Sequence, residues 1–370
     1  MNGTPAPDRS VHFVMPWSVH DPSAPSGGNI YDLRMCRELP GMGWQVHEHT
    51  VDGTWPHPGE AARAELEQLL TGLADGTAVL LDGLVACGVP EIVVPHAGRL
   101  GLAVLVPLPL ADETGLDPGT AAELDALERE TLRAAPLVVA TSRWSADRLV
   151  AHHGLDPGRV RIAAPGTDPA PLAPGSGGVP RLLCVASVTP RKGQHRLVEA
   201  LAELTDLAWE CVFVGGVGQA PGYVARVRET IEKTGLDDRV RLVGPQSGAK
   251  LEASWARADL LVLASYAETY GMAVTEALAR GIPVLATAVG GIPEAIGRAP
   301  GGDVPGVLVP PDDQEALVAA LRHWLSDPRS RHGLKTAAHR RRTALEGGDT
   351  SCRKLADALG HLLHEHGGTA

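Results

Sequence analysis

The sequence has few aromatic residues and no long hydrophobic run. Phe, Trp and Tyr make up only 4% of the 370 residues, although 44% of the chain is hydrophobic. A core built from Val, Leu, Ala and Ile is typical of strands buried between helices, which favours an α/β protein. The longest apolar run, GLAVLVPLPLA at 101–111, contains two prolines and is too short to span a bilayer. The N-terminus has no basic-then-apolar signal, so we expect a cytoplasmic protein.

Basic residues are in deficit. Lys and Arg number 33 against 44 Asp and Glu, which gives a net charge of −11 and argues against a nucleic-acid partner, because phosphate contacts need clustered cations. The stretch 329–342, RSRHGLKTAAHRRR, is the local exception, with six Lys/Arg and no acid. A solvated helix face is the usual outcome for such a run, and contact with an anionic lipid surface is the alternative. We therefore expect no membrane contact.

The five cysteines are scattered and never stand in a Cys-x-x-Cys spacing. This pattern excludes a disulfide framework and a thiolate metal centre, so we expect small buried residues.

Strand-like segments alternate with helical ones along the chain. The first half has strand candidates at 11–17, near Gln45, and at 78–83, 102–108 and 137–142; the second has six, at 181–188, 210–216, 239–244, 258–265, 283–288 and 306–311. This alternation predicts parallel sheets with helical crossovers, and 370 residues favour two domains.

A stretch rich in proline and glycine separates the two halves. Residues 163–180 contain five prolines and little apolar periodicity, as interdomain linkers do. We predict an N-terminal Rossmann-like domain over 1–165, a linker over 166–180 and a C-terminal Rossmann-like domain over 181–345. A helix over 346–370 either ends the second domain or crosses back to the first.

Two glutamates stand near the end of the fourth strand of the second half. Glu268 falls in the loop after that strand, and Glu276 lies in the helix MAVTEALARG, which Gly281 closes. The first turn of such a helix is an anion site. Eight helical steps span about 12 Å, which is similar to the reach of a nucleotide sugar. One carboxylate would hold sugar hydroxyls and the other ribose hydroxyls, unless both merely decorate a surface helix.

Further candidates follow other strands of both halves. Lys192 precedes a helix where it can neutralise a diphosphate, and the pairs Gly27-Gly28 and Gly290-Gly291 allow close approach of backbone to a ligand. An ordinary helix-start lysine and simple turns are the structural alternatives. Ligands of parallel sheets bind beyond the carboxyl ends of the strands, where all of these residues fall. The segment GGVGQAPG at 215–222 imitates a dinucleotide loop, but its last glycine is displaced from the G-x-G-x-x-G pattern.

The motifs TPRKG at 189–193, ADLLVLASYAETYGMAVTEALARGIPVLATAVGGIPEAI at 258–296 and GVLVPPDDQEALVAAL at 306–321 resemble one family. It is the retaining nucleotide-sugar glycosyltransferases of family 4, with the GT-B fold of two doubly wound Rossmann-like domains facing a central cleft. The resemblance implies that the 1–165 domain lies on the acceptor side and that the 181–345 domain binds the nucleotide sugar. It implies no metal and no cofactor, because Lys192 and a helix start take the place of a cation.

The same resemblance implies roles for individual residues. Glu268 and Lys192 would be the catalytic residues, with Glu268 on hydroxyls of the donor sugar and Lys192 on the phosphates. Glu276 would hold the ribose. The other donor-binding positions would be Gly27, Gly28, Ser187, Arg191 and the backbone at Tyr270, Gly271 and Met272, and the loop after Gly244 would border the base.

Two positions depart from the family pattern. An arginine that grips the diphosphate in the family corresponds to Ser187 here, and Arg191 is the expected substitute. A histidine near the C6 hydroxyl of the donor sugar corresponds to Pro107, which has no side-chain donor. Either His96 or His20 replaces that histidine, or the donor sugar is unusual near C6, as in specialised metabolism.

The resulting expectation is a retaining glycosyltransferase that moves a sugar from a UDP or GDP donor to a small-molecule or glycosidic acceptor. The alternatives are a phosphorylase or a sugar-nucleotide epimerase on the same fold, and a non-catalytic protein that binds sugar nucleotides. A nicotinamide oxidoreductase is disfavoured by the displaced glycine.

Overall fold

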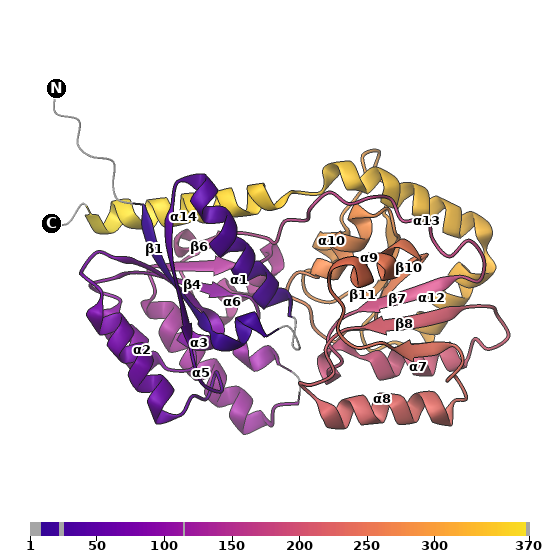
Figure 1. Cartoon of the computed structure of the whole chain (residues 1–370), viewed down its shortest axis with the longest axis horizontal. Coiled ribbons are helices and arrows are strands. Elements are labelled where there is room, and N and C mark those ends of the chain that lie inside the picture. The colour runs from indigo at the N-terminus through magenta and orange to yellow at the C-terminus, as the bar shows by residue number, and fades with distance from the viewer. Residues whose placement is uncertain (1–8, 22–25, 114, 368–370) are drawn as a thin grey trace. The chain divides into compact units, whose positions relative to one another are not determined.

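A computed structural model describes residues 9–21, 26–113 and 115–367. The chain forms two compact units. Unit 1 holds the described residues up to Asp21, Gly27–Pro165 and the chain from Asp349 onward, whereas unit 2 holds Ser26 and Gly166–Gly348. Each unit is built on one parallel six-stranded sheet, which confirms the predicted α/β class (Figure 1).

Unit 1 has the strand order β2-β1-β3-β4-β5-β6, and all its pairings are parallel. Its strands are β1 (Ser10–Pro16), β2 (Gln45–Val51), β3 (Ala78–Asp82), β4 (Gly101–Val106), β5 (Leu137–Ala140) and β6 (Val160–Ile162). Its helices are α1 (Gly27–Glu38), α2 (Glu60–Gly72), α3 (Gly83–Ala86), α4 (Pro90–Val93), α5 (Pro118–Ala134) and α6 (Arg143–His153). Short 3-10 turns lie at η1 (Trp17–His20), η2 (Leu39–Met42), η3 (Val94–His96), η4 (Leu110–Asp112) and η5 (Pro157–Arg159). Strand β6, of three residues, has no counterpart in the sequence prediction.

The sheet of unit 1 is buried on both faces. Side chains alternate along β4, so that Leu102 and Val104 belong to one core with α2 and α5, while Ala103 and Leu105 belong to a second core with α1. The second core also takes in Leu355 and Leu359 of helix α14 (Gly348–Gly367). Most of this last helix therefore packs within unit 1, beside the first strand and helix of the chain (Figure 1).

Unit 2 repeats the plan with the strand order β12-β11-β10-β7-β8-β9. Its strands are β7 (Arg181–Val185), β8 (Glu210–Val214), β9 (Val240–Leu242), β10 (Leu260–Leu263), β11 (Val284–Thr287) and β12 (Gly306–Val309). Its helices are α7 (Gln194–Ala202), α8 (Pro221–Lys233), α9 (Gly248–Ala256), α10 (Met272–Ala279), α11 (Ile292–Ile296), α12 (Gln314–Ser326) and α13 (Pro328–Arg341), with 3-10 turns at η6 (Pro190–Lys192) and η7 (Arg342–Ala344). Helices α7 and α8 lie on one face of the sheet, and α9 and α10 on the other (Figure 1).

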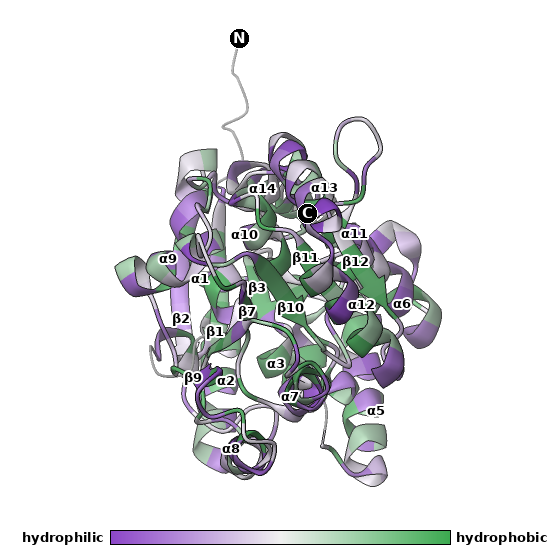
Figure 2. Cartoon of the chain, turned by 90° about the vertical axis from the view of Figure 1, so that its right-hand side faces the viewer, coloured by the Kyte–Doolittle hydropathy of each residue, from purple (hydrophilic) through white to green (hydrophobic). Residues whose placement is uncertain are grey.

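The six strands predicted for the second half are all present, but most are shorter than predicted. Strand β10 ends at Leu263 and β7 at Val185, two or three residues before the apolar pattern stops. The residues that follow, such as Ala264 and Ser265, stay buried as they leave the sheet. Figure 2 shows the central strand β10 as hydrophobic along its length, as expected for a strand covered on both faces.

The proline-rich segment 166–180 follows the surface of unit 2. The amide of Ala173 donates to the carbonyl of Arg280, and that of Gly175 donates to Ala256. The amide of Ser176 donates to the Asp259 carboxylate, so the segment is tied at several points to the unit that it enters.

The basic segment 329–342 uses its arginines within unit 2. Arg331 donates to the carbonyls of Trp324 and Leu325, Arg341 to that of Ile296, and Arg342 to that of Ala279. These guanidinium groups therefore bind carbonyl oxygens at the ends of other helices, a use that neither a solvated face nor a lipid-facing patch predicts. None of the helices in the described part of the chain combines the length and the apolar character that crossing a bilayer requires.

Candidate functional site

Three loops of unit 2 meet at the carboxyl edge of its sheet. Strands β11, β10 and β7 are neighbours and run parallel, so the loops that follow them emerge side by side. They carry Gly290-Gly291, Glu268 and Lys192 respectively. The sheet thus brings together three of the segments that the sequence singled out, although up to a hundred residues separate them in the chain.

Glu268 is the centre of this cluster. Its side chain is buried, and Lys192 Nζ donates to both carboxylate oxygens at 2.7 Å. Ser265 Oγ donates to Oε1 at 2.9 Å. The Arg191 guanidinium stands 3.9 Å from Oε2 and donates to the carbonyl of Ala267 at 3.1 Å. The carboxylate is therefore held by two cations and a hydroxyl group from two different loops.

The opposite charges in this cluster stabilise each other's ionised forms. Burial works against the ionised form of Glu268, but Lys192, Arg191 and the hydrogen bonds from Lys192 and Ser265 outweigh it, and the pKa of Glu268 lies below its usual value. Burial lowers the pKa of Lys192, and the Glu268 carboxylate opposes that effect. The two side chains thus support each other's charged forms in the salt bridge, and removing either partner would leave a buried charge alone.

Backbone contacts fix the loop that carries Glu268. The carbonyl of Glu268 accepts a hydrogen bond from the amide of Gly291 at 2.9 Å. A Cβ atom on Gly290, whose φ is +51°, would lie 1.7 Å from the same carbonyl oxygen. Only glycine allows this approach. The sequence suggested that the backbone of Gly290-Gly291 approaches a ligand. In the structure this backbone approaches that of Glu268.

The start of helix α10 faces the same edge. Gly271 has a φ of +94° and forms the N-cap, and its carbonyl accepts from the amide of Val274. The first amide groups of a helix have no intrahelical acceptor, so Tyr270, Gly271 and Met272 place backbone donors and a positive dipole end here. At its other end the helix closes before Gly281, which is left-handed as predicted.

Glu276 lies one turn into α10 and is half-buried. Burial raises its pKa to about 7, with Arg280 opposing and the charges of Glu252 and Asp168 adding to the rise. Its carboxylate accepts no hydrogen bond from the residues that the structure describes, although the Glu276 carbonyl accepts one from Arg280. A carboxylate without such donors keeps its acceptor capacity for a ligand that brings hydroxyl groups.

The two departures from the family pattern have distinct surroundings. Ser187 follows β7, and its carbonyl accepts from Gln194 Nε2 at 2.9 Å, so this position is held through its backbone. Arg191 reaches the Glu268 loop from the next turn, as the bonds above describe.

Pro107 follows β4 directly in unit 1. His96 precedes β4, in η3, and therefore lies at the opposite edge of the sheet from Pro107. His20 follows β1 at the carboxyl edge, where it pairs with Glu48 at 3.0 Å. Of the two histidines, only His20 lies at the same edge of the sheet as Pro107. Gly27 and Gly28 open helix α1 of the same unit.

Two residues of the cluster were missed by sequence reasoning. Ser265 was read as the last residue of a strand, yet its hydroxyl binds Glu268 and its carbonyl accepts from Thr287. Gln194 opens α7, and its side-chain amide fastens the loop at Ser187. A buried polar residue just beyond an apolar strand was the available signal for Ser265, and Gln194 gave none.

Comparison with known proteins places the chain. Residues 175–341 match the family model described as "Glycosyl transferases group 1". The "D-inositol 3-phosphate glycosyltransferase" of Kineococcus radiotolerans is 32% identical over 247 residues, which are 60% of this chain and 57% of that protein. The "D-inositol 3-phosphate glycosyltransferase 1" of Catenulispora acidiphila is 34% identical over 270 residues, 68% of this chain and 62% of that protein. The chain thus spans between half and two thirds of the length of these relatives.

Solved structures share the whole fold at low identity. Sucrose-phosphate synthase from Thermosynechococcus elongatus has a TM-score of 0.77 at 21% identity, and the match covers 96% of this chain and all of that one. The Anabaena protein HepE in complex with UDP-glucose has a TM-score of 0.74 at 18% identity, over 95% of this chain and 99% of that one. These matches show the GT-B fold, and the family model identifies residues 175–341 as a glycosyl transferases group 1 domain, of the retaining glycosyltransferases of family 4.

Proposed function

We propose that this chain transfers a sugar from a nucleoside diphosphate donor to a small-molecule or glycosidic acceptor, with retention at the anomeric carbon. The observation that carries the proposal is the buried Lys192–Glu268 ion pair at the start of α10. Such a site offers a cation and helix amides to a diphosphate, beside a carboxylate for sugar hydroxyls. We further propose Glu268 and Lys192 as the residues that act on the donor.

The ion pair leaves capacity for a ligand. An ammonium group has three N–H donors, and Lys192 directs two of them at Glu268, so one remains for a phosphate oxygen. Glu268 has further lone pairs for sugar hydroxyls. Because the departing diphosphate gains negative charge, Lys192 and the amides of Tyr270, Gly271 and Met272 would stabilise it most as the glycosidic bond breaks. These residues position and polarise the donor, and no covalent nucleophile is needed.

Glu276 completes the donor site in this proposal. Its half-buried carboxylate would accept the two ribose hydroxyls, for which its acceptor capacity is available. Arg191 would add one charged contact to the diphosphate, in place of the arginine that Ser187 does not supply. Gly27 and Gly28 stand in the first turn of α1, and we propose them as further donor-binding residues.

The relatives suggest a donor and an acceptor class. The Anabaena neighbour is described in complex with UDP-glucose, which favours a UDP-sugar over a GDP-sugar as donor. The curated relatives are named for transfer to D-inositol 3-phosphate, which favours a small polyol acceptor. Pro107 supplies no side-chain donor at that position, so either His20 takes the place of the family histidine or the donor sugar differs near C6.

A donor screen followed by a transfer assay tests the proposal. Ligands that prefer the folded state raise the melting temperature, so UDP, GDP and their sugars should separate in a thermal-shift screen. The stabilising donor is then incubated with and without a panel of polyols and glycosides. Transfer that requires an acceptor supports the proposal. Rapid donor consumption without acceptor would favour a phosphorylase or an epimerase, and binding without any turnover would favour a non-catalytic protein.

A further inference from the structure

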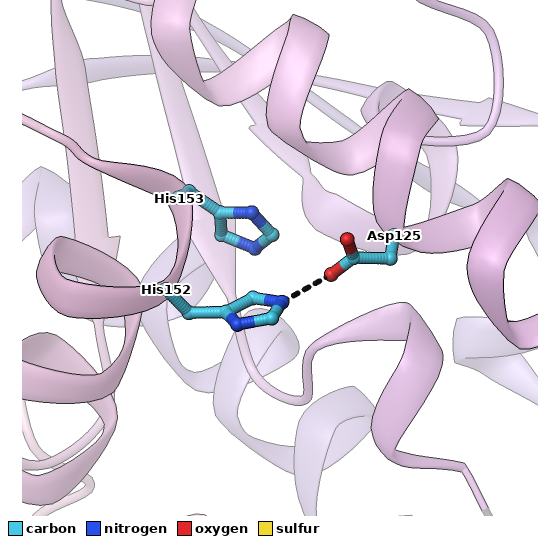
Figure 3. A group of neighbouring side chains, drawn as sticks. All are labelled: Asp125, His152 and His153. Atoms are coloured by element: carbon cyan, nitrogen blue, oxygen red, sulfur yellow. Dashed lines mark hydrogen bonds and ion pairs between the residues drawn. The ribbon is translucent and has the colours of Figure 1, made fainter.

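Asp125, His152 and His153 form a compact cluster in unit 1. Asp125 projects from α5, and the two histidines form the last turn of α6 (Figure 3). One potential ligand atom from each residue lies within 4.8 Å of the others. The two imidazole rings stand 4.8 Å apart at 69°. None of these residues belongs to the donor site proposed above, which is built in unit 2.

His153 is only half satisfied. Its Nε2 lies 3.1 Å from Glu128 Oε2, and both side chains are 1% exposed. Glu128 is itself held, because its Oε1 accepts from the amide of Leu110. The other ring nitrogen, Nδ1, is buried with no hydrogen-bond partner among the described residues. A histidine whose one nitrogen is fixed by a buried carboxylate is the arrangement that metal sites use to orient their ligands.

The electrostatics of the cluster favour a cation. The histidines lie at the C-terminal end of α6, where Gly154 closes the helix in a left-handed conformation and the dipole is negative. Arg129 binds Oδ2 of Asp125, while His152 faces Oδ1. Arg148 is bound by both oxygens of Asp112. The carboxylates Asp112, Asp125 and Glu128 stand among three guanidinium groups, those of Arg129, Arg148 and Arg133, and Arg133 donates to the carbonyl of His153. The negative end of α6 is therefore what favours a cation here.

We propose that Asp125, His152 and His153 bind a divalent transition-metal ion of the zinc class. Two imidazoles and a carboxylate suit Zn²⁺, whereas Mg²⁺ and Ca²⁺ prefer oxygen ligands throughout. Glu128 orients His153 or supplies a further oxygen. The ion would join α5 to α6 beside Pro109, Ala111 and Asp112, which line the same hollow and follow β4. Its role is to fasten this part of unit 1, and it takes no part in the chemistry of the donor.

Metal titration tests this site directly. The full chain is treated with EDTA, dialysed and titrated with ZnCl₂ by calorimetry, and Co²⁺ is used as a coloured probe. We expect one tight equivalent, a higher melting temperature with Zn²⁺ and the visible absorption of Co²⁺ bound by nitrogen and oxygen. Asp125→Asn and His152→Asn should each weaken Zn²⁺ binding by at least about 10- to 100-fold.

A second histidine cluster provides the control. His12, His47 and His49 stack on neighbouring strands of the same unit, with His12 Nδ1 2.9 Å from His49 Nε2. The double variant His47→Gln/His49→Gln should leave the tight equivalent unchanged. His152 is 44% exposed, so its replacement should not prevent folding. The proposal is overturned if the wild type binds no Zn²⁺, if His152→Asn binds as tightly as the wild type, or if the tight equivalent disappears in the His47/His49 variant.

Discussion

The loop Ser265–Gly271 of unit 2 and the loop Pro107–Asp112 of unit 1 both follow a central strand of a parallel sheet, but they differ in what holds them. The first carries its own buried carboxylate, Glu268, and draws Lys192 and Ser265 to it. The second has no ionisable side chain before Asp112 and is held by Glu128 and Arg148 from the helices beneath it. The unit 2 loop thus carries a buried charge of its own, whereas the charges at the unit 1 loop come mainly from neighbouring helices. We therefore expect the donor chemistry in unit 2.

Glu268→Gln should break this comparison most strongly. It removes the charge that faces Lys192, so we expect kcat to fall roughly 10²- to 10³-fold and the free energy of unfolding to fall by roughly 3 kcal/mol. The matched control is Glu229→Gln, because Glu229 forms an exposed pair with Lys233. That change should cost less than about 1 kcal/mol and leave kcat unchanged. Equal effects of the two variants would mean that burial gives the Glu268 pair no special importance.

Gly290→Ala tests whether the close approach of the Gly290 backbone to the Glu268 carbonyl is required. The new methyl group would overlap the Glu268 carbonyl, and we expect a loss of about 1–3 kcal/mol in stability and roughly 100-fold in activity. Gly248→Ala is the control, because Gly248 has the same φ of +51° and no atom within 4 Å of the added Cβ. If both variants behave alike, the strain of the φ angle accounts for the effect and the contact does not.

Arg191→Ala asks whether this residue replaces the missing arginine at Ser187. Removing one charged contact should weaken binding of the nucleotide sugar by about tenfold, measured by calorimetry. Arg322→Ala, which breaks an exposed pair with Asp206, should leave the affinity unchanged. An unaltered affinity in Arg191→Ala would remove Arg191 from the donor site.

The raised pKa of Glu276 predicts a pH dependence of donor binding. The ionised carboxylate accepts ribose hydroxyls best, so affinity should be full above the pKa of about 7 and fall by up to about tenfold for each pH unit below it. A nucleotide sugar is the right ligand, since its diphosphate carries no free phosphate monoester that titrates near neutrality. Glu276→Gln should bind more weakly at high pH and show a flatter profile. A wild-type profile that is flat from pH 5 to 8 would contradict the assignment.

Asp112→Asn should have the smallest effect of these variants. It tests whether the loop of unit 1 contributes to donor binding. It weakens the partly exposed pair with Arg148, and we expect a loss of about 1 kcal/mol or less in unfolding experiments. The affinity for nucleoside diphosphate should stay the same. A loss of nucleotide affinity in this variant would mean that the unit 1 loop also holds the donor.

The repeated strand pattern predicted both sheets, since apolar runs separated by helical stretches allow few other folds. The early ends of β7 and β10 were beyond prediction, because burial continues past the last ladder bond. The short strand β6 was not predicted. The loop placement of Glu268 and Lys192 followed from strand ends. Their direct contact did not, because it depends on β7 and β10 being neighbours, which is a property of the strand order. The contact of Gly290 with Glu268 depends in the same way on β11 lying beside β10.

Binding of UDP to wild-type chain, Lys192→Met and Lys233→Met, measured by calorimetry, tests the central claim most directly. Lys233 forms an exposed pair with Glu229 and provides the matched lysine outside the site. The account predicts one saturable equivalent in the wild type and in Lys233→Met, and at least about tenfold weaker binding in Lys192→Met, since one charged contact to a phosphate is lost. Equal affinity in all three proteins would contradict it, because the diphosphate would then bind away from the buried Lys192–Glu268 pair.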